Sequence, residues 1–227
     1  ARPEPKEIGE GLGISPEERS WWAFQPITRA ALPIPVGQER VRTAIDSFVL
    51  ARLKEKKLGF AADADRLTLV KRVYLDLLGL PPTYEQARAF IDDKSADAYE
   101  RLIDSCLESP HYGERWGRHW LDLVRYAETN GYERDGNKPE AWRYRQWVID
   151  AFNKDKPYDQ MIMEQLAGDE LDNPTRETIT ATGYYRLGVF DDEPADRVQS
   201  VYDGYDDILR TTSEVFMGMT VGCARCH

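Results

Sequence analysis

Cysteine and histidine are scarce in this chain, whose 227 residues include three of each. Three cysteines cannot build the disulfide framework that holds many small secreted domains together. They are also unevenly placed. Cys106 stands alone, whereas Cys223 and Cys226 fall within the last five residues and are followed directly by His227. The few reactive side chains are therefore concentrated at one end of the sequence.

Long apolar runs and positive charge are lacking as well. No stretch of about 18 apolar residues occurs, so no segment is expected to span a membrane. The chain has 30 basic against 40 acidic residues and a net charge of −10, which argues against a nucleic-acid or anionic-membrane surface. An acidic surface instead keeps a protein soluble or suits a basic partner. Residues 1–5 lack the apolar core of a signal peptide, so an exported form would be a mature or excised piece of a longer protein.

Strand patterns, internal repeats and nucleotide-binding glycine loops are also missing, whereas apolar residues recur at helical spacing from Val41 onward. The sequence predicts an all-α fold, a multi-helix orthogonal bundle with an extended arm over residues 1–40, where prolines recur. The helical domain is expected over residues 41–227, with a subdivision near residue 109 into 41–108 and 109–227. The arm carries W-W-A-F-Q-P from Trp21, which we expect to pin it to the helices by burying large rings. A carbohydrate platform is the alternative.

The chain ends in C-x-x-C-H, the attachment pattern of c-type haem. Two thiols separated by two residues can reach the two vinyl groups of the macrocycle, and the adjacent imidazole can bind the iron. Cys223 and Cys226 are thus the predicted thioether residues, and His227 is the predicted iron ligand. A zinc half-site or a redox-active thiol pair would also use two cysteines at this spacing, but neither explains the histidine.

The helix predicted from His111 to about Ala127 carries the candidates for a second iron ligand. His119 shares a helical face with several aromatic rings, which we expect to be buried, so it is a candidate for the distal side of the haem. A core histidine bonded to a carbonyl is an equal alternative. His111 lies in the first turn of this helix and is expected to be solvated or capping.

The segment after this helix, residues 129–139, is dense in turn formers and charge. Glu133 and Asp135 could form an acid-base pair, although a solvated loop is the simpler interpretation. Guanidinium groups match carboxylates, so haem propionates could be held by one of three arginines: Arg134, Arg143 and Arg145.

Four motifs together resemble one known family. They are W-W-A-F-Q-P, R-V-Y-L-D-L-L-G-L-P-P-T from Arg72, S-P-H-Y-G-E-R-W-G-R-H-W-L-D-L-V-R-Y-A-E-T-N-G-Y-E-R-D from Ser109, and V-G-C-A-R-C-H. Over nearly the whole chain the sequence is similar to the second type of planctomycete cytochrome c domain. The resemblance implies an extracytoplasmic protein with covalent haem on Cys223 and Cys226, ligated by His227. The resemblance makes His119 a better candidate for the distal ligand than helical spacing alone does, and His111 a weaker candidate. In this family the chain commonly continues beyond the histidine and carries further domains.

The leading hypothesis is a periplasmic or extracellular domain that passes single electrons to a redox partner or to further domains of the parent chain. A haem oxidoreductase with an open distal site is the alternative, with acid-base groups from Tyr126, Asn130, Glu133 and Asp135. A third hypothesis is a carbohydrate-binding module that meets polysaccharide through exposed aromatic rings, with haem incidental. Burial of most of the six tryptophans would argue against this last hypothesis.

Overall fold

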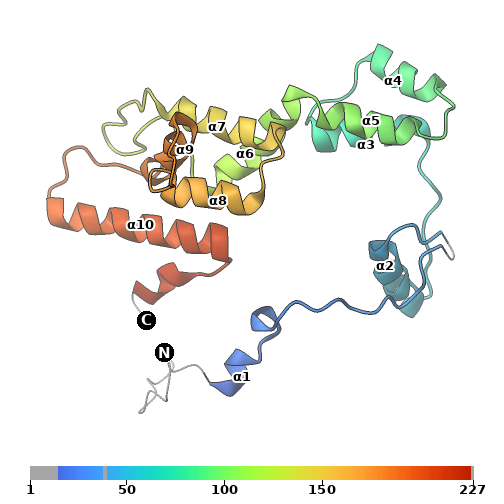
Figure 1. Ribbon diagram of the computed structural model, residues 1–227, viewed down its shortest axis with the longest axis horizontal. Helices are drawn as coiled ribbons and strands as arrows, with labels where there is room; N and C mark the ends of the chain where they lie inside the picture. The colour runs from blue at the N-terminus through green and yellow to red at the C-terminus, as the bar shows by residue number, and fades with distance from the viewer. Residues whose placement is uncertain (1–14, 38–39, 226–227) are drawn as a thin grey trace. The chain divides into compact units, whose positions relative to one another are not determined.

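The computed structural model describes residues 15–37 and 40–225, and its regular elements over these ranges are all helical (Figure 1). The predicted all-α class is confirmed. The chain divides into two compact units, residues 1–63 and 64–227. The predicted boundaries at residues 40 and 109 and the orthogonal arrangement stay predictions. None of the helices in the described ranges has the length and apolar character of a membrane span.

Unit 1 contains a short helix α1 (Pro16–Arg19), a 3₁₀ turn η1 (Trp22–Phe24) and one longer helix, α2 (Ala44–Glu55). Thr43 and Asp46 form a capping box at the start of α2, because each side chain accepts the backbone N–H of the other. The rings of Trp21, Trp22 and Phe24 are exposed in this unit. The expectation that these rings pin the arm to the helices that follow stays a prediction.

The first part of unit 2 is formed by α3 (Arg66–Leu77), α4 (Tyr84–Asp92) and α5 (Ala98–Leu107). The predicted cap of α4 is confirmed, since Thr83 accepts the N–H of Gln86 in a capping box. Helices α3 and α5 lie side by side (Figure 1). The core that they share with α4 contains Val70, Val73, Phe90, Ala98, Leu102 and Cys106. Burial raises the pKa of the Cys106 thiol and makes it unreactive.

The second part of unit 2 contains the remaining elements. They are α6 (Pro110–Leu123), α7 (Ala141–Asn153), α8 (Tyr158–Ala167), α9 (Arg176–Ala181), η2 (Thr182–Arg186), α10 (Arg197–Met217) and η3 (Val221–Arg225). Their core is rich in rings, including Trp120, Tyr144, Trp147 and Tyr184. The indole N–H of Trp120 donates to Gln165 Oε1 at 3.0 Å, so the polar edge of this buried ring is satisfied. This core supports the elements that carry the candidate site.

Helix α6 packs closely on α7 through Gly113 and Gly117. A Cβ on Gly113 would lie 2.3 Å from the backbone oxygen of Ile149, whereas one on Gly117 would lie 3.4 Å from its nearest neighbour, Val148 Cγ1. We expect Gly113→Ala to lower the free energy of unfolding by about 2 kcal/mol, because the two helices must separate. Urea denaturation measures this change.

Gly117→Ala is the matched control on the same helix face. Its methyl group fits in ordinary contact and replaces a poor helix former, so a gain of roughly 0.5 to 1 kcal/mol is expected. Equal losses of unfolding free energy in the two variants would contradict the conclusion that position 117 has room for a methyl group and position 113 does not.

Candidate functional site

The C-terminal segment turns back along α10. Gly218 ends that helix in the left-handed region at φ 64°, and the N–H of Met219 returns to the carbonyl of Ser213 at 3.0 Å. Gly222 then lies against the side chain of Arg210, where a Cβ would come within 2.6 Å of Cγ. The reversal is visible below α10 in Figure 1. It brings Gly222 and Arg225 beside the middle of this helix.

Arg225, the residue before the second cysteine, anchors the returning segment. Its guanidinium meets Asp203 Oδ1 at 3.0 Å and Asp206 Oδ2 at 2.8 Å, both on α10. Cys223 lies in η3 with an exposed side chain outside any disulfide. Cys226 and His227 lie outside the described residues. An exposed thiol on a surface turn fits covalent attachment, because a macrocycle can approach it.

The predicted distal ligand, His119, lies on the exposed face of α6 with its ring edge-on to Trp116, at a centroid distance of 5.6 Å. The expectation of a buried aromatic stripe is wrong. The buried side of α6 carries Gly113, Gly117 and Trp120, because the two glycines let α7 approach that side. Ligation by His119 stays a prediction.

His111 lies in the first turn of α6, as expected, and is exposed. Its Nδ1 pairs with Glu114 Oε2 at 2.7 Å. The helix that carries both histidines ends at Leu123, four residues before the predicted end, because Arg125 adopts a positive φ of 53° that a helix cannot continue through.

A cavity of about 990 Å³ lies beside the first half of α10. Its walls come from the 130–143 segment, from η2 with the 187–196 loop, and from α10. The apolar side chains that line it include Ile179, Tyr185, Phe190, Val201, Tyr205 and Ile208. Several hydrogen bonds connect the walls. The N–H of Phe190 donates to the carbonyl of Asn130 at 3.0 Å, and the Lys138 ammonium donates to carbonyls of the loop after η2.

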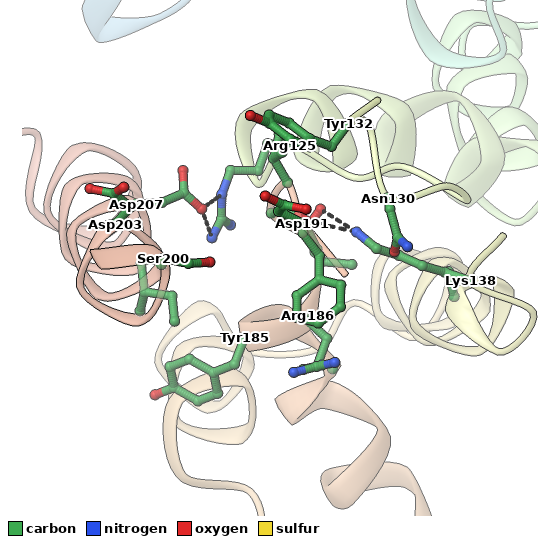
Figure 2. Close-up of a pocket in the computed structure, with 18 of the residues that line it drawn as sticks. Arg125, Asn130, Tyr132, Lys138, Tyr185, Arg186, Asp191, Ser200, Asp203 and Asp207 are labelled. Atoms are coloured by element: carbon green, nitrogen blue, oxygen red, sulfur yellow. Dashed lines mark hydrogen bonds and ion pairs between the residues drawn. The ribbon is translucent and has the colours of Figure 1, made fainter. Parts of the chain in front are cut away.

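Arg125 and Lys138 are two of the partly buried cations of this cavity (Figure 2). Arg125 Nε donates to Asp207 Oδ2 at 2.7 Å. Its Nη2 is buried and lies 2.7 Å from the same oxygen, yet it has no aligned acceptor among the described residues. Lys138 Nζ donates to the carbonyls of Leu187 at 3.2 Å and Gly188 at 2.7 Å.

Burial lowers the pKa of Lys138, and the charges of Arg186 and then Arg125 lower it further. Asp135 and Asp207 oppose this shift, and the cavity lining as a whole carries four basic and five acidic side chains.

The three arginines predicted to hold propionates already have carboxylate partners: Arg134 pairs with Glu193, Arg143 with Glu140, and Arg145 with Glu128. Of the three, Arg143 lines the cavity. Two other cations, Arg125 and Lys138, line the same cavity. No local pattern marks Arg125, because its partner Asp207 is 82 positions away.

The predicted acid-base groups are only partly brought together. Asn130 lines the cavity, but Tyr126, Glu133 and Asp135 are not among its lining residues. Hydrogen bonds from Thr129 and then from the N–H of Gly131 lower the pKa of Asp135. Burial and a hydrogen bond to Glu128 raise the pKa of Tyr126 to about 12. Asp135 therefore has a structural role in its turn.

The tryptophans divide into two groups. Trp120 and Trp147 are buried, whereas four are exposed: Trp21, Trp22, Trp116 and Trp142. Burial of most of the six would have argued against carbohydrate binding. Because four are exposed, the carbohydrate-binding alternative is not excluded and stays a prediction.

Comparison with known protein families identifies the family of this chain. Residues 44–227 match the model of PSCyt2, described as a protein of unknown function (DUF1549). The chain belongs to the PSCyt2 family. The name is a planctomycete cytochrome-related one and agrees with the resemblance found in the sequence, while the description leaves the function open. No curated protein and no solved structure matches this PSCyt2 chain.

Proposed function

We propose that this PSCyt2 domain is a c-type cytochrome domain that binds covalent haem and transfers electrons outside the cytoplasm. The observation that carries the proposal is the C-x-x-C-H pentapeptide, with Cys223 exposed on a turn that Arg225 anchors to α10. Mass spectrometry under denaturing conditions tests it directly, because covalent haem adds about 616 Da to the chain.

The residues have distinct roles in this proposal. Cys223 and Cys226 tether the macrocycle through thioethers, and His227 binds the iron. Arg225 holds the turn that carries Cys223 in place through its two aspartates. The bound haem supplies one-electron chemistry, and the surrounding helices exclude water and thereby tune the potential.

The proposal extends to location and partners. Thioether attachment takes place after export, so we place the domain in the periplasm or outside the cell. Its partner would be a redox protein or further domains of the parent chain. Polysaccharide binding through exposed tryptophans is the remaining alternative, and a glycan pull-down with Trp142→Ala as the variant would test it.

The sixth coordination position separates an electron carrier from a haem oxidoreductase. With His119 bound, the reduced protein does not take up carbon monoxide, and His119→Ala makes it do so. With an open position, wild type and His119→Ala both bind the gas. Optical spectra of the reduced proteins, with and without carbon monoxide, measure the difference.

A further inference from the structure

We propose that the cavity beside α10 binds a neutral saccharide, a ligand that is rich in hydroxyl groups and carries no charge. The proposal goes beyond electron transfer and does not depend on haem, because no cysteine or histidine is among the described residues that line the cavity. It also differs from carbohydrate binding at exposed tryptophans, since none of these described lining residues is a tryptophan.

The size of the cavity suits an oligosaccharide. Sites for small molecules generally measure about 300 to 1,000 Å³ and combine apolar walls with a few placed polar groups. The volume of about 990 Å³ lies at the upper end of this range. A single sugar ring would fill only part of the space, so the expected ligand has several linked rings.

The charged side chains of the cavity favour a ligand without charge. The four basic and five acidic residues of the lining are bonded mainly to one another or to the backbone. Arg125 pairs with Asp207 at 2.7 Å, and Arg143 pairs with Glu140. The Lys138 ammonium donates to two backbone carbonyls. These contacts leave little net charge for a ligand to neutralise.

The other charged lining residues also have partners. Asp196 caps α10 by accepting its first N–H groups at 2.9 and 3.0 Å, and Asp203 pairs with Arg225 at 3.0 Å. Asp191 accepts a backbone N–H at 3.0 Å, and the Arg186 guanidinium lies over a phenyl ring at 5.3 Å from its centroid. A charged ligand would compete with these contacts, whereas a neutral ligand leaves them intact.

Uncharged polar side chains of the lining supply hydrogen bonds for a saccharide. They are Asn130, Tyr132, Ser200 and Tyr205, and their side chains have no hydrogen-bond partner within residues 15–37 and 40–225. Amides and hydroxyls both donate and accept, as does each hydroxyl of a sugar. An anion would need donors alone and a metal ion acceptors alone, so this mixed set matches hydroxyl groups. Figure 2 shows Ser200 extending from α10 and Asn130 from another wall of the cavity.

Aromatic rings provide the apolar part of the site. Tyr185, Phe190 and Tyr205 line the cavity and are exposed. The C–H groups of a sugar ring form apolar faces that pack on aromatic rings. A bound saccharide would therefore cover rings that now face water, while its hydroxyl groups reach the polar side chains.

Calorimetric titration of the full chain with neutral tetrasaccharides tests the proposal. The probes are cellotetraose, maltotetraose, mannotetraose and xylotetraose. At least one is expected to bind with a dissociation constant below about 1 mM. If none of the four binds this tightly, the proposal is wrong. Tighter binding of anionic tetragalacturonic acid than of every neutral probe would overturn the neutral class.

Tyr205→Ala and Tyr202→Ala locate the bound sugar. The two side chains lie on α10 and are 63% and 61% exposed, but Tyr205 lines the cavity and Tyr202 does not. Loss of the ring in Tyr205→Ala is expected to weaken binding at least about tenfold, while Tyr202→Ala stays within about twofold of wild type. Equal losses in the two variants would place the sugar on the outer face of α10 and contradict the cavity assignment.

Gly204 gives an independent test, because it lines the cavity and a Cβ added there would meet nothing within 4 Å. Gly204→Trp is expected to abolish binding of the probe by filling the space, and Gly204→Ala, the matched control, keeps it. Wild-type affinity in a Gly204→Trp protein with the wild-type unfolding temperature would overturn the proposal. The haem mass is expected to be unchanged in every variant. Loss of sugar binding and loss of haem are therefore separate outcomes, and only the second contradicts the proposed function.

Discussion

Replacing Cys223 and Cys226 together with alanine is expected to abolish covalent haem attachment. Both thioethers are lost, so the increase of about 616 Da disappears from the denatured mass of the chain. Each single variant keeps one possible thioether and is expected to retain haem at a lower yield. The measurement is a denaturing mass spectrum combined with haem staining of the exported full chain.

Cys106→Ala is the matched control for this experiment. Its thiol is buried in the core formed by α3, α4 and α5, away from the attachment motif in sequence. It is expected to retain the full haem mass while losing roughly 1 kcal/mol of stability, because a small core side chain is shortened. An unmodified wild-type mass after maturation in a host that attaches haem to other proteins would contradict the haem proposal.

Lys156→Met is expected to lower the free energy of unfolding by about 3 to 5 kcal/mol. Lys156 pairs with Glu164, and both side chains are almost completely buried, with 8% and 3% of their surface exposed. Glu164 also accepts from Trp147 Nε1 at 3.2 Å and from Gln160 Nε2 at 2.7 Å. Removal of the lysine leaves a buried carboxylate without its cation.

Lys154→Met provides the comparison, because Lys154 is two residues away and contacts Glu177, a carboxylate that Lys156 also contacts. Its side chain is 60% exposed, so the change is expected to stay within about 0.5 kcal/mol. Urea denaturation of both variants measures the contrast. Similar losses in the two would indicate that burial does not determine the strength of the Lys156 pair.

Much of the fold could be predicted because its signals are local. Thr83 with Gln86 begins α4, Pro110 begins α6, and Gly168 ends α8, each through backbone chemistry that involves residues within one helical turn. The helical spacing of apolar residues also predicts the approximate length of each helix. The main error in extent concerns α6, where the pattern of rings continues past Leu123 but the backbone turns at Arg125.

The orientation of α6 could not be predicted in the same way. Tyr112, Trp116 and His119 form the more aromatic face, which favoured burial of that face. The tertiary structure buries the neighbouring face instead, because Gly113 and Gly117 allow the backbone of α7 to approach within contact distance. Packing of two backbones depends on the partner helix, and a single helical pattern does not contain that information.

The sequence by itself determined the all-helical class, the positions of most helix ends and the C-x-x-C-H motif, because each depends on residues close together in the chain. Only the tertiary structure decided which face of α6 is buried, that Lys156 and Glu164 form a buried pair, and that Arg125, Lys138 and Asp207 meet at one cavity. Those outcomes depend on contacts between distant segments, which form when helices pack and exclude water, and no local spacing specifies them.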